Sequence, residues 1–253
     1  MRNKLLFLLA VMLFFGGLSV LLYPSLKTAA LRREERGVIE NFEQYRASAA
    51  AASPVEPVDE PCANNTETAE KLTGQMFPEL WAACVAFNEQ LPTTQRTAYT
   101  ADSLRRPSII TSDYGWEQEA FGFLSIPTAD IEAPVYLGAS SANMDKGAAV
   151  LGQTSLPIGG NSTNCVIAGH RTWSSTVRFK GLEQLKLGDK VYLTNPWETL
   201  VYEAIEIKTV LPDTQDEIMV QKGRDLLTVF TCTNPNTRRY MVICERITGG
   251  TGS

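Results

Sequence analysis

Short apolar segments recur along the second half of the chain, with turn residues between them. Residues 199–210 alternate between apolar and polar side chains, which is the period of a half-exposed strand. Similar short segments cover residues 121–126, 131–136, 165–168, 190–194, 226–231 and 240–246. Strands of this length and spacing predict a mostly antiparallel β-barrel or sandwich. Pro134 interrupts the second segment and indicates an edge strand or a bulge there.

The N-terminal region has a different pattern. Residues 5–23 carry no charge, and they are preceded by Arg2 and Lys4 and followed by Pro24. A run of this length can span a bilayer as a helix, and the basic residues favour a cytoplasmic N-terminus. We expect residues 1–26 to form a cytoplasmic tip and a signal-anchor transmembrane helix, the alternative being a cleavable signal peptide. Both interpretations place the rest of the chain outside the cytosol, where disulfides are permitted.

Residues 27–119 are expected to form a helical extension with a linker. Apolar residues at helical spacing predict helices over residues 29–51 and 68–90. The proline-rich stretch 53–61 between them is typical of a linker. The interval 91–119 then precedes the first predicted strand. The β-rich part follows as residues 120–253.

The composition narrows the functional classes. A net charge of −5 and a pI near 5.1 argue against nucleic-acid binding. A hydrophobic fraction of 44% excludes wholesale disorder. His170 is the single histidine, so zinc sites made of two or three histidines are excluded, and any catalytic imidazole must be His170. Five cysteines cannot all pair within one chain, and whether Cys62 and Cys84 pair is left open.

Two motifs place reactive side chains at the ends of predicted strands. The first runs from residue 164 to 171 and reads NCVIAGHR, after TSLPIGG at residues 154–160. The second runs from 226 to 233 and reads LLTVFTCT, with NTRRYMV following at 236–242. A barrel presents such strand ends to a groove at its rim. His170, Cys232 and one of two arginines are therefore candidates for one site.

Together these segments resemble sortases, the membrane-anchored cysteine transpeptidases of Gram-positive bacteria, and most of all their class C, pilin-polymerising branch. The resemblance covers about residues 120–246 and the N-terminal anchor. It implies a mainly β fold: a closed barrel of about eight strands with few short helices, plus the transmembrane helix and helical extension. It also implies that His170, Cys232 and an arginine are catalytic.

Two neighbouring arginines compete for the third position. Arg239 and Arg238 must lie on opposite faces of their strand, so only one can point at Cys232. Aligning residues 236–242 with the class C pattern Asn-Thr-His-Arg implies that Arg239 is catalytic, with Arg238 as the alternative. Thr231 and Arg238 are expected to bind substrate. Trp173 could line the same groove or simply cover the end of the barrel.

The resemblance also implies a reaction. Cys232 would attack the Thr-Gly bond of an LPxTG-like sorting signal on a surface or pilin protein and form a thioacyl intermediate. An amine would resolve it, either a pilin lysine in pilus assembly or a cell-wall precursor in a housekeeping sortase. A further alternative is an inactive extracellular binding module. The catalytic domain is expected outside the cell on a single-pass membrane anchor.

The chain departs from class C in two respects. Class C members often carry a lid with an Asp-Pro-aromatic motif, which residues 91–119 lack. Asp113, Tyr114 and Trp116 could form a degenerate lid, or this stretch could be an ordinary surface loop. No second apolar span follows the β-rich part. Because the acidic loop around Asp216 has no full ligand set, we expect no metal, and we expect no cofactor.

Overall fold

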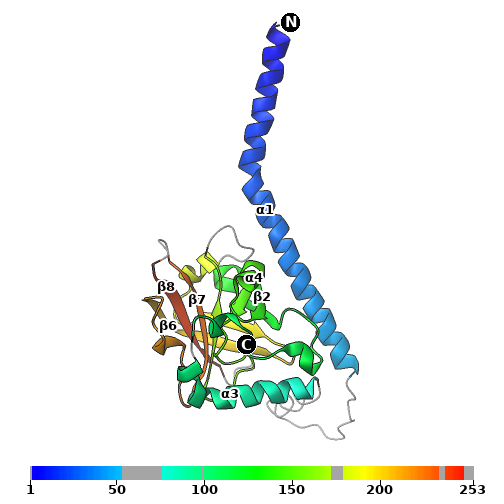
Figure 1. The fold of residues 1–253 in the computed structure, drawn as a ribbon. Helices are drawn as coiled ribbons and strands as arrows, with labels where there is room; N and C mark the ends of the chain where they lie inside the picture. Colours follow the sequence, from blue (N-terminus) through cyan, green and yellow to red (C-terminus); the bar gives the residue numbers. More distant parts are fainter. Residues whose placement is uncertain (1, 53–75, 99, 172–178, 234–236, 248–253) are drawn as a thin grey trace.

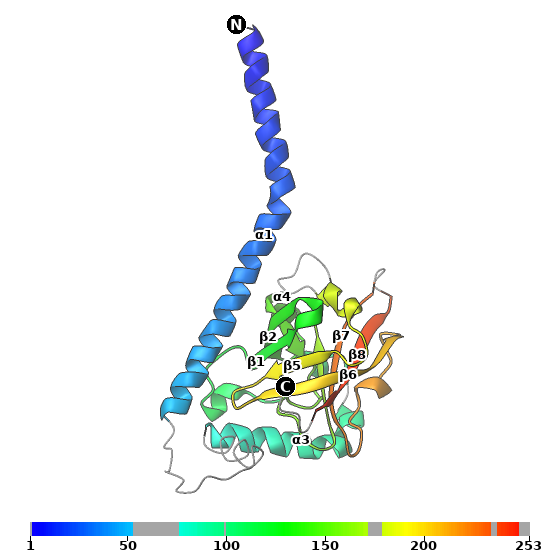
Figure 2. The same ribbon diagram turned by 180° about the vertical axis from the view of Figure 1, so that it is seen from behind.

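The computed structural model describes residues 2–52, 76–98, 100–171, 179–233 and 237–247. Within these ranges, eight strands close into a barrel in the order β1-β2-β3-β4-β7-β8-β6-β5 (Figures 1 and 2). Their bounds are β1 Gly122–Ile126, β2 Ile131–Leu137, β3 Ala148–Val150, β4 Thr163–Ala168, β5 Lys190–Thr194, β6 Thr199–Val210, β7 Asp225–Cys232 and β8 Arg239–Arg246. The predicted closed, mainly β barrel is confirmed.

The pairing of the strands is mostly antiparallel, as the sequence predicts, with β2–β3 and β4–β7 as the parallel pairs. The sequence pattern misses β3, whose three residues are all buried and so show no alternation. Pro134 does not mark an edge strand. It pairs with Phe123 of β1 but precedes Val135, where the pairing of β2 with β3 begins, so the missing N–H breaks no β2–β3 ladder.

Two apolar clusters lie on opposite faces of β4, β7 and β8. The main core fills the barrel and includes Ile167, Val229 and Val242, each fully buried. The second, which we call the outer cluster, consists of Leu151, Val166, Ala168, Ile218, Met219, Phe230 and Met241. Because side chains alternate along a strand, this division shows which residues of each strand face outward.

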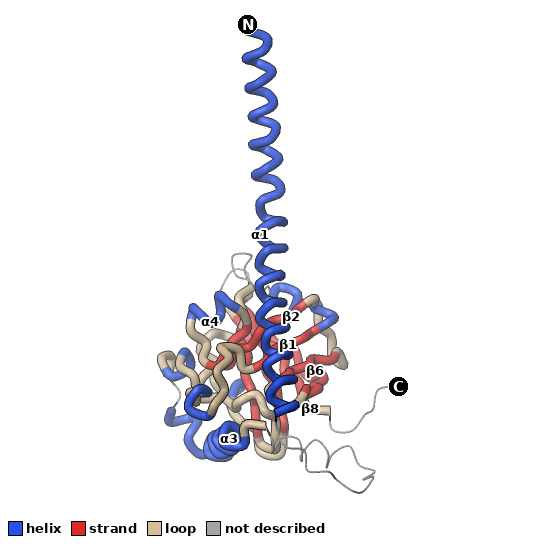
Figure 3. Tube along the Cα trace, turned by 90° about the vertical axis from the view of Figure 1, so that its right-hand side faces the viewer, coloured by secondary structure: helices blue, strands red, loops and turns tan. Residues whose placement is uncertain are grey.

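Helix α1 (Arg2–Ala52) is continuous where the sequence predicts two helices, and its last turns lie over β1 and β2 (Figures 1 and 3). The segments Ala10–Tyr23 and Ser25–Ala52 are bent by 42° relative to each other. In the described part of the chain, no one helix meets the length and apolarity of a membrane span, whereas this bent pair taken together does.

Helix α3 (Pro78–Ala98) crosses one end of the barrel and continues past Pro92, although the sequence predicts an end at residue 90. Hydrogen bonds on both sides of the proline hold it. The Asn88 amide pairs with both backbone groups of Leu156. The Gln95 amide donates to the carbonyl of Ile218 and accepts from the N–H of Val220. These tertiary bonds offset the intrahelical bond that Pro92 cannot make.

Candidate active site

Three side chains singled out in the sequence meet on adjoining strands. Ala168 at the end of β4 pairs with Phe230 of β7. Two residues further along β7, Cys232 pairs directly with Arg239 at the start of β8. His170 lies two residues beyond Ala168, which carries it to the level of Cys232. We call His170, Cys232 and Arg239 the Cys232 row.

The Cys232 row lies on the outer face of the barrel. Phe230 and Met241, the row below it on β7 and β8, both belong to the outer cluster. Residues two apart share a face, so Cys232 and Arg239 project outward as well. Both are partly exposed, which a reactive pair requires. Directly opposite residues on antiparallel strands have Cβ atoms about 4.5–5.5 Å apart.

The two candidate arginines differ in their surroundings. The Arg239 guanidinium carbon lies 5.0 Å from the centre of the Phe230 ring, so a cation–π contact holds the side chain along the outer face. Arg238 is exposed and belongs to the connection between β7 and β8. Its backbone N–H and carbonyl both bond to Thr233. This geometry favours Arg239 as the partner of Cys232.

The backbone before His170 is fixed from two sides. The N–H of Gly169 donates to the carbonyl of Phe230 at 3.2 Å, and the Thr231 hydroxyl donates to the Gly169 carbonyl at 2.8 Å. Thr231 is 1% exposed, because its side chain points away from the outer face. The expectation that Thr231 binds substrate stays a prediction. In the structure, Thr231 supports the chain that carries His170.

The short 3₁₀ helix η4 (Phe179–Gln184) fixes the other side of His170. The N–H of Phe179 donates to the His170 carbonyl at 3.1 Å. The Arg171 guanidinium forms a two-pronged ion pair with Glu183. These contacts join η4 to the end of β4, on either side of residues 172–178. Trp173, a predicted substrate contact, lies outside the described residues.

Gly169 allows this close approach of η4. A Cβ at that position would lie 2.3 Å from the Phe179 ring. We expect Gly169→Ala to reduce the free energy of unfolding by about 1–3 kcal/mol through overpacking. Thermal unfolding followed by circular dichroism would measure this. Gly37→Ala is the control, because nothing lies within 4 Å of its Cβ. Equal melting temperatures for both variants would contradict the packing argument.

One close neighbour of His170 has no sequence signal. Asp145, on the short helix α4 (Ser141–Lys146), places Oδ1 3.5 Å from Nε2 of His170. The two residues are far apart in the chain and belong to no common motif. Only the folded barrel brings α4 beside the end of β4.

The described cysteines fall into two classes. Cys84, Cys165 and Cys244 are buried free thiols, whereas Cys232 is partly exposed. Burial raises the pKa of Cys84 and of Cys244 to about 12, and it raises the pKa of Cys165 further above its usual range. The buried thiols are therefore poor nucleophiles. Cys62 lies outside the described residues.

This difference predicts selective alkylation. With iodoacetamide at neutral pH, we expect the native protein to be modified at Cys232, with Cys84, Cys165 and Cys244 protected until guanidinium unfolds it. Peptide mapping by mass spectrometry assigns each site. Modification of Cys165 or Cys244 at the rate of Cys232 in the native protein would contradict the burial argument.

The three candidate lid residues differ in burial and in their contacts. Trp116 is 1% exposed, and its ring packs edge-on against Phe42, Tyr45 and Phe77. It is a core residue that joins α1 to the barrel, and its expected lid role stays a prediction. Tyr114 is half-buried against the same core, and Asp113 is exposed on η2 (Thr111–Tyr114). A lid made by these two residues stays a prediction.

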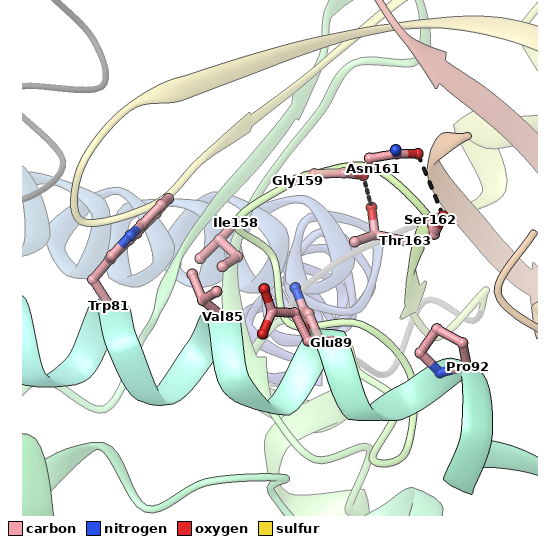
Figure 4. A pocket seen from close by; sticks show the side chains of 11 residues that line it. Trp81, Val85, Glu89, Pro92, Ile158, Gly159, Asn161, Ser162 and Thr163 are labelled. Carbon is pink, nitrogen blue, oxygen red and sulfur yellow. Dashed lines mark hydrogen bonds between the residues drawn. The ribbon is translucent and has the colours of Figure 1, made fainter. Parts of the chain in front are cut away.

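A cavity of about 440 Å³ lies along α3, away from the Cys232 row. Its apolar end is formed by Trp81, Val85 and Ile158, and its far wall by residues 159–163 (Figure 4). Among the described residues, no group of three or more His, Cys, Asp or Glu side chains is placed to hold a metal ion. In the acidic loop, Asp216 and Glu217 instead form ion pairs with Arg96 and Lys208.

Known proteins resemble this barrel in sequence and in architecture. The sortase domain family matches residues 124–247. Sortase A of Streptococcus agalactiae serotype III (strain NEM316) is 33% identical over 129 residues, which is 49% of this chain and 51% of that protein. The chain thus spans about half the length of this relative.

Solved structures extend the similarity. The pilus-related sortase C of Group B Streptococcus is 31% identical with a TM-score of 0.58, and the match covers 73% of this chain and 97% of that one. Sortase C-1 of Streptococcus pneumoniae is 28% identical with a TM-score of 0.62, covering 84% and 98%. The fold is therefore shared with solved sortase C structures.

Proposed function

The chain belongs to the sortase family of cysteine transpeptidases and is most like its class C members, and we propose that it cleaves LPxTG-like sorting signals between Thr and Gly and transfers them to an amine. The observation that carries the proposal is the Cys232 row. It combines a thiol, an imidazole and a guanidinium at the ends of β4, β7 and β8, on the outer face. Each of these three groups has a role in acyl transfer.

The proposed reaction proceeds in two steps. The Cys232 sulfur, as thiolate, attacks the Thr carbonyl carbon, and the C–N bond to Gly breaks as the amine leaves with a proton from His170. The thioacyl enzyme is then attacked by the second amine, whose proton returns to His170 as the C–S bond breaks. Arg239 supplies fixed positive charge and forked donors for the carbonyl oxygen as it becomes negative.

The similarity to pilus-related sortase C supports a pilin lysine as the second amine. The similarity to sortase A supports the alternative of a cell-wall precursor, because the housekeeping enzymes use that nucleophile. The inactive binding module is disfavoured by the intact Cys232 row. The pilin lysine and the wall-precursor amine differ in chain length and in the charge around them. A direct competition between the two amines therefore shows which one the protein uses.

Membrane anchoring is the second part of the proposal. Large apolar side chains of α1 are exposed, among them Leu13 at 69%, Val20 at 76% and Leu21 at 73%. Such a surface is unfavourable in water and suits a lipid environment. We therefore propose that the first part of α1, up to residue 26, is the anchor, with the barrel outside the cell.

The test uses the full chain in detergent micelles. It is incubated with a fluorogenic peptide containing LPxTG and with equal amounts of a lysine-bearing pilin peptide and a wall-precursor stem peptide. We expect mass spectrometry to show cleavage after Thr and a new isopeptide on the lysine peptide. Transfer to the stem peptide instead would select the housekeeping alternative. If neither LPxTG nor a related signal is cleaved, the proposed enzyme activity is refuted.

A further inference from the structure

The helix α4 has anchors on both sides of Asp145. Its first turn is capped by Ser140, whose hydroxyl accepts from the N–H of Asn143. The Asn143 amide in turn donates to the carbonyls of Leu137 and Gly138, at 3.0 and 2.8 Å, which ties α4 to the end of β2. The position of this short helix is thus set by the barrel.

The neighbours of Asp145 complete this anchoring. Met144 packs against the outer cluster, the same cluster that contains Phe230 directly below Cys232. Lys146 forms a 2.6 Å ion pair with Glu119 on the other side. Residues 143, 144 and 146 therefore each fix α4 in a different direction. The Asp145 side chain between them points its Oδ1 to Nε2 of His170.

We propose that Asp145 is the positioning residue for His170. An imidazole has two nitrogens, and a carboxylate at one of them selects the tautomer that carries its proton there. With Nε2–H held toward Asp145, Nδ1 is the nitrogen that takes and returns the proton in acyl transfer. A nucleophile and base oriented by a third group is a general arrangement in covalent catalysis.

The surroundings of His170 supply no competing carboxylate contact in the described part of the chain. Glu183 on η4 is occupied by Arg171, and Lys180 on the same helix is exposed. On the strand side, Arg239 lies opposite Cys232. The Asp145 side chain is 70% exposed and that of His170 is 36% exposed, so solvent screens their attraction and the effect is one of orientation.

The inference rests on the proposed transpeptidase activity, so its main readout is independent of turnover. Because the chain has a single histidine, selective ¹⁵N-histidine labelling of the full chain gives the ring signals of His170 alone. At a pH at which the imidazole is neutral, we expect the wild-type spectrum to show the Nε2–H tautomer. In Asp145→Asn the signals should move toward a mixture of the two tautomers. Asp216→Asn, which removes another exposed carboxylate in a single ion pair, should leave them unchanged.

Turnover provides the second readout. We expect Asp145→Asn to lower kcat about tenfold with little change in KM, well below the ~10⁴-fold loss for a buried triad aspartate. Asp145→Glu should restore part of kcat. Asp145→Asn, Asp145→Glu and Asp216→Asn should all have the melting temperature of the wild type. Unchanged ring signals together with wild-type kcat in Asp145→Asn would overturn the inference. Ring signals that respond in a protein without transpeptidation would instead refute the proposed function and leave Asp145 as the partner of His170.

Discussion

Cys232→Ala is expected to abolish both cleavage of the sorting signal and formation of the thioacyl enzyme. Cys232 is the one described thiol that is partly exposed, and it lies opposite Arg239 on the outer face. Without the sulfur no covalent intermediate can form, and losses for a missing nucleophile are on the order of 10⁶ in kcat. The measurement is single-turnover cleavage of an LPxTG peptide, with intact-protein mass spectrometry for the acyl adduct.

The variant must remain folded for this result to be informative. Because Cys232 is at the end of β7 and only partly buried, we expect the melting temperature to change little. Cys232→Ser is the matched variant, since it keeps the size of the side chain and replaces the thiolate with a poor nucleophile. An acyl adduct on Cys232→Ala would show that another group is the nucleophile and would refute the proposed mechanism.

The second large effect is expected at Arg239. Arg239→Ala removes the guanidinium of the residue that lies opposite Cys232 on β8, and we expect kcat to fall by about 10²–10³, the loss typical of one oxyanion donor. Arg238→Ala is the matched control, because its side chain is exposed beside the turn and on the other face of the strand. We expect its kcat to fall by no more than a few-fold, and the expected role of Arg238 in binding substrate to appear in KM. Steady-state kinetics on the same peptide measures kcat and KM for both arginine variants.

Two further expected results refine the prediction for Arg239. Arg239→Lys keeps the charge but not the planar fork, so it should recover only part of the lost kcat. The cation–π contact with Phe230 contributes roughly 0.5–1 kcal/mol, so Arg239→Ala should lower the melting temperature slightly. A larger kcat loss for Arg238→Ala than for Arg239→Ala would reverse the assignment made from strand parity.

Alternation predicts the strands that are half-exposed, and short apolar runs predict those that are buried. The alternating segment 199–210 coincides with β6, and the segment 190–194 with β5. The apolar runs 165–168 and 226–231 fall in β4 and β7, which are buried on both faces. β3 has only three residues, all buried, which is too short for either pattern. α3 continues beyond its predicted end because Asn88 and Gln95 bond to distant parts of the barrel. No local pattern records such bonds.

The candidate site also has parts that the sequence predicts and parts that only the structure shows. The motifs ending in His170 and Cys232 identify these residues locally, and parity separates Arg239 from Arg238. Trp116 was expected in a lid, yet its ring is taken up by the aromatic cluster with Phe42, which lies some seventy residues earlier in the chain. Thr231 faces inward because its neighbour Cys232 occupies the outer face, and the structure adds a bond from its hydroxyl to the Gly169 carbonyl that no motif records.

The sequence by itself determined the strand pattern, the reactive groups and the order in which they follow along the chain, because these depend on local periodicity and on residue type. The tertiary structure decided which groups meet. Parallel pairing of β4 with β7 brings His170 to the level of Cys232, and the packing of α4 on the outer cluster brings Asp145 to His170. Both are contacts between segments far apart in sequence, and only the closed barrel fixes their register.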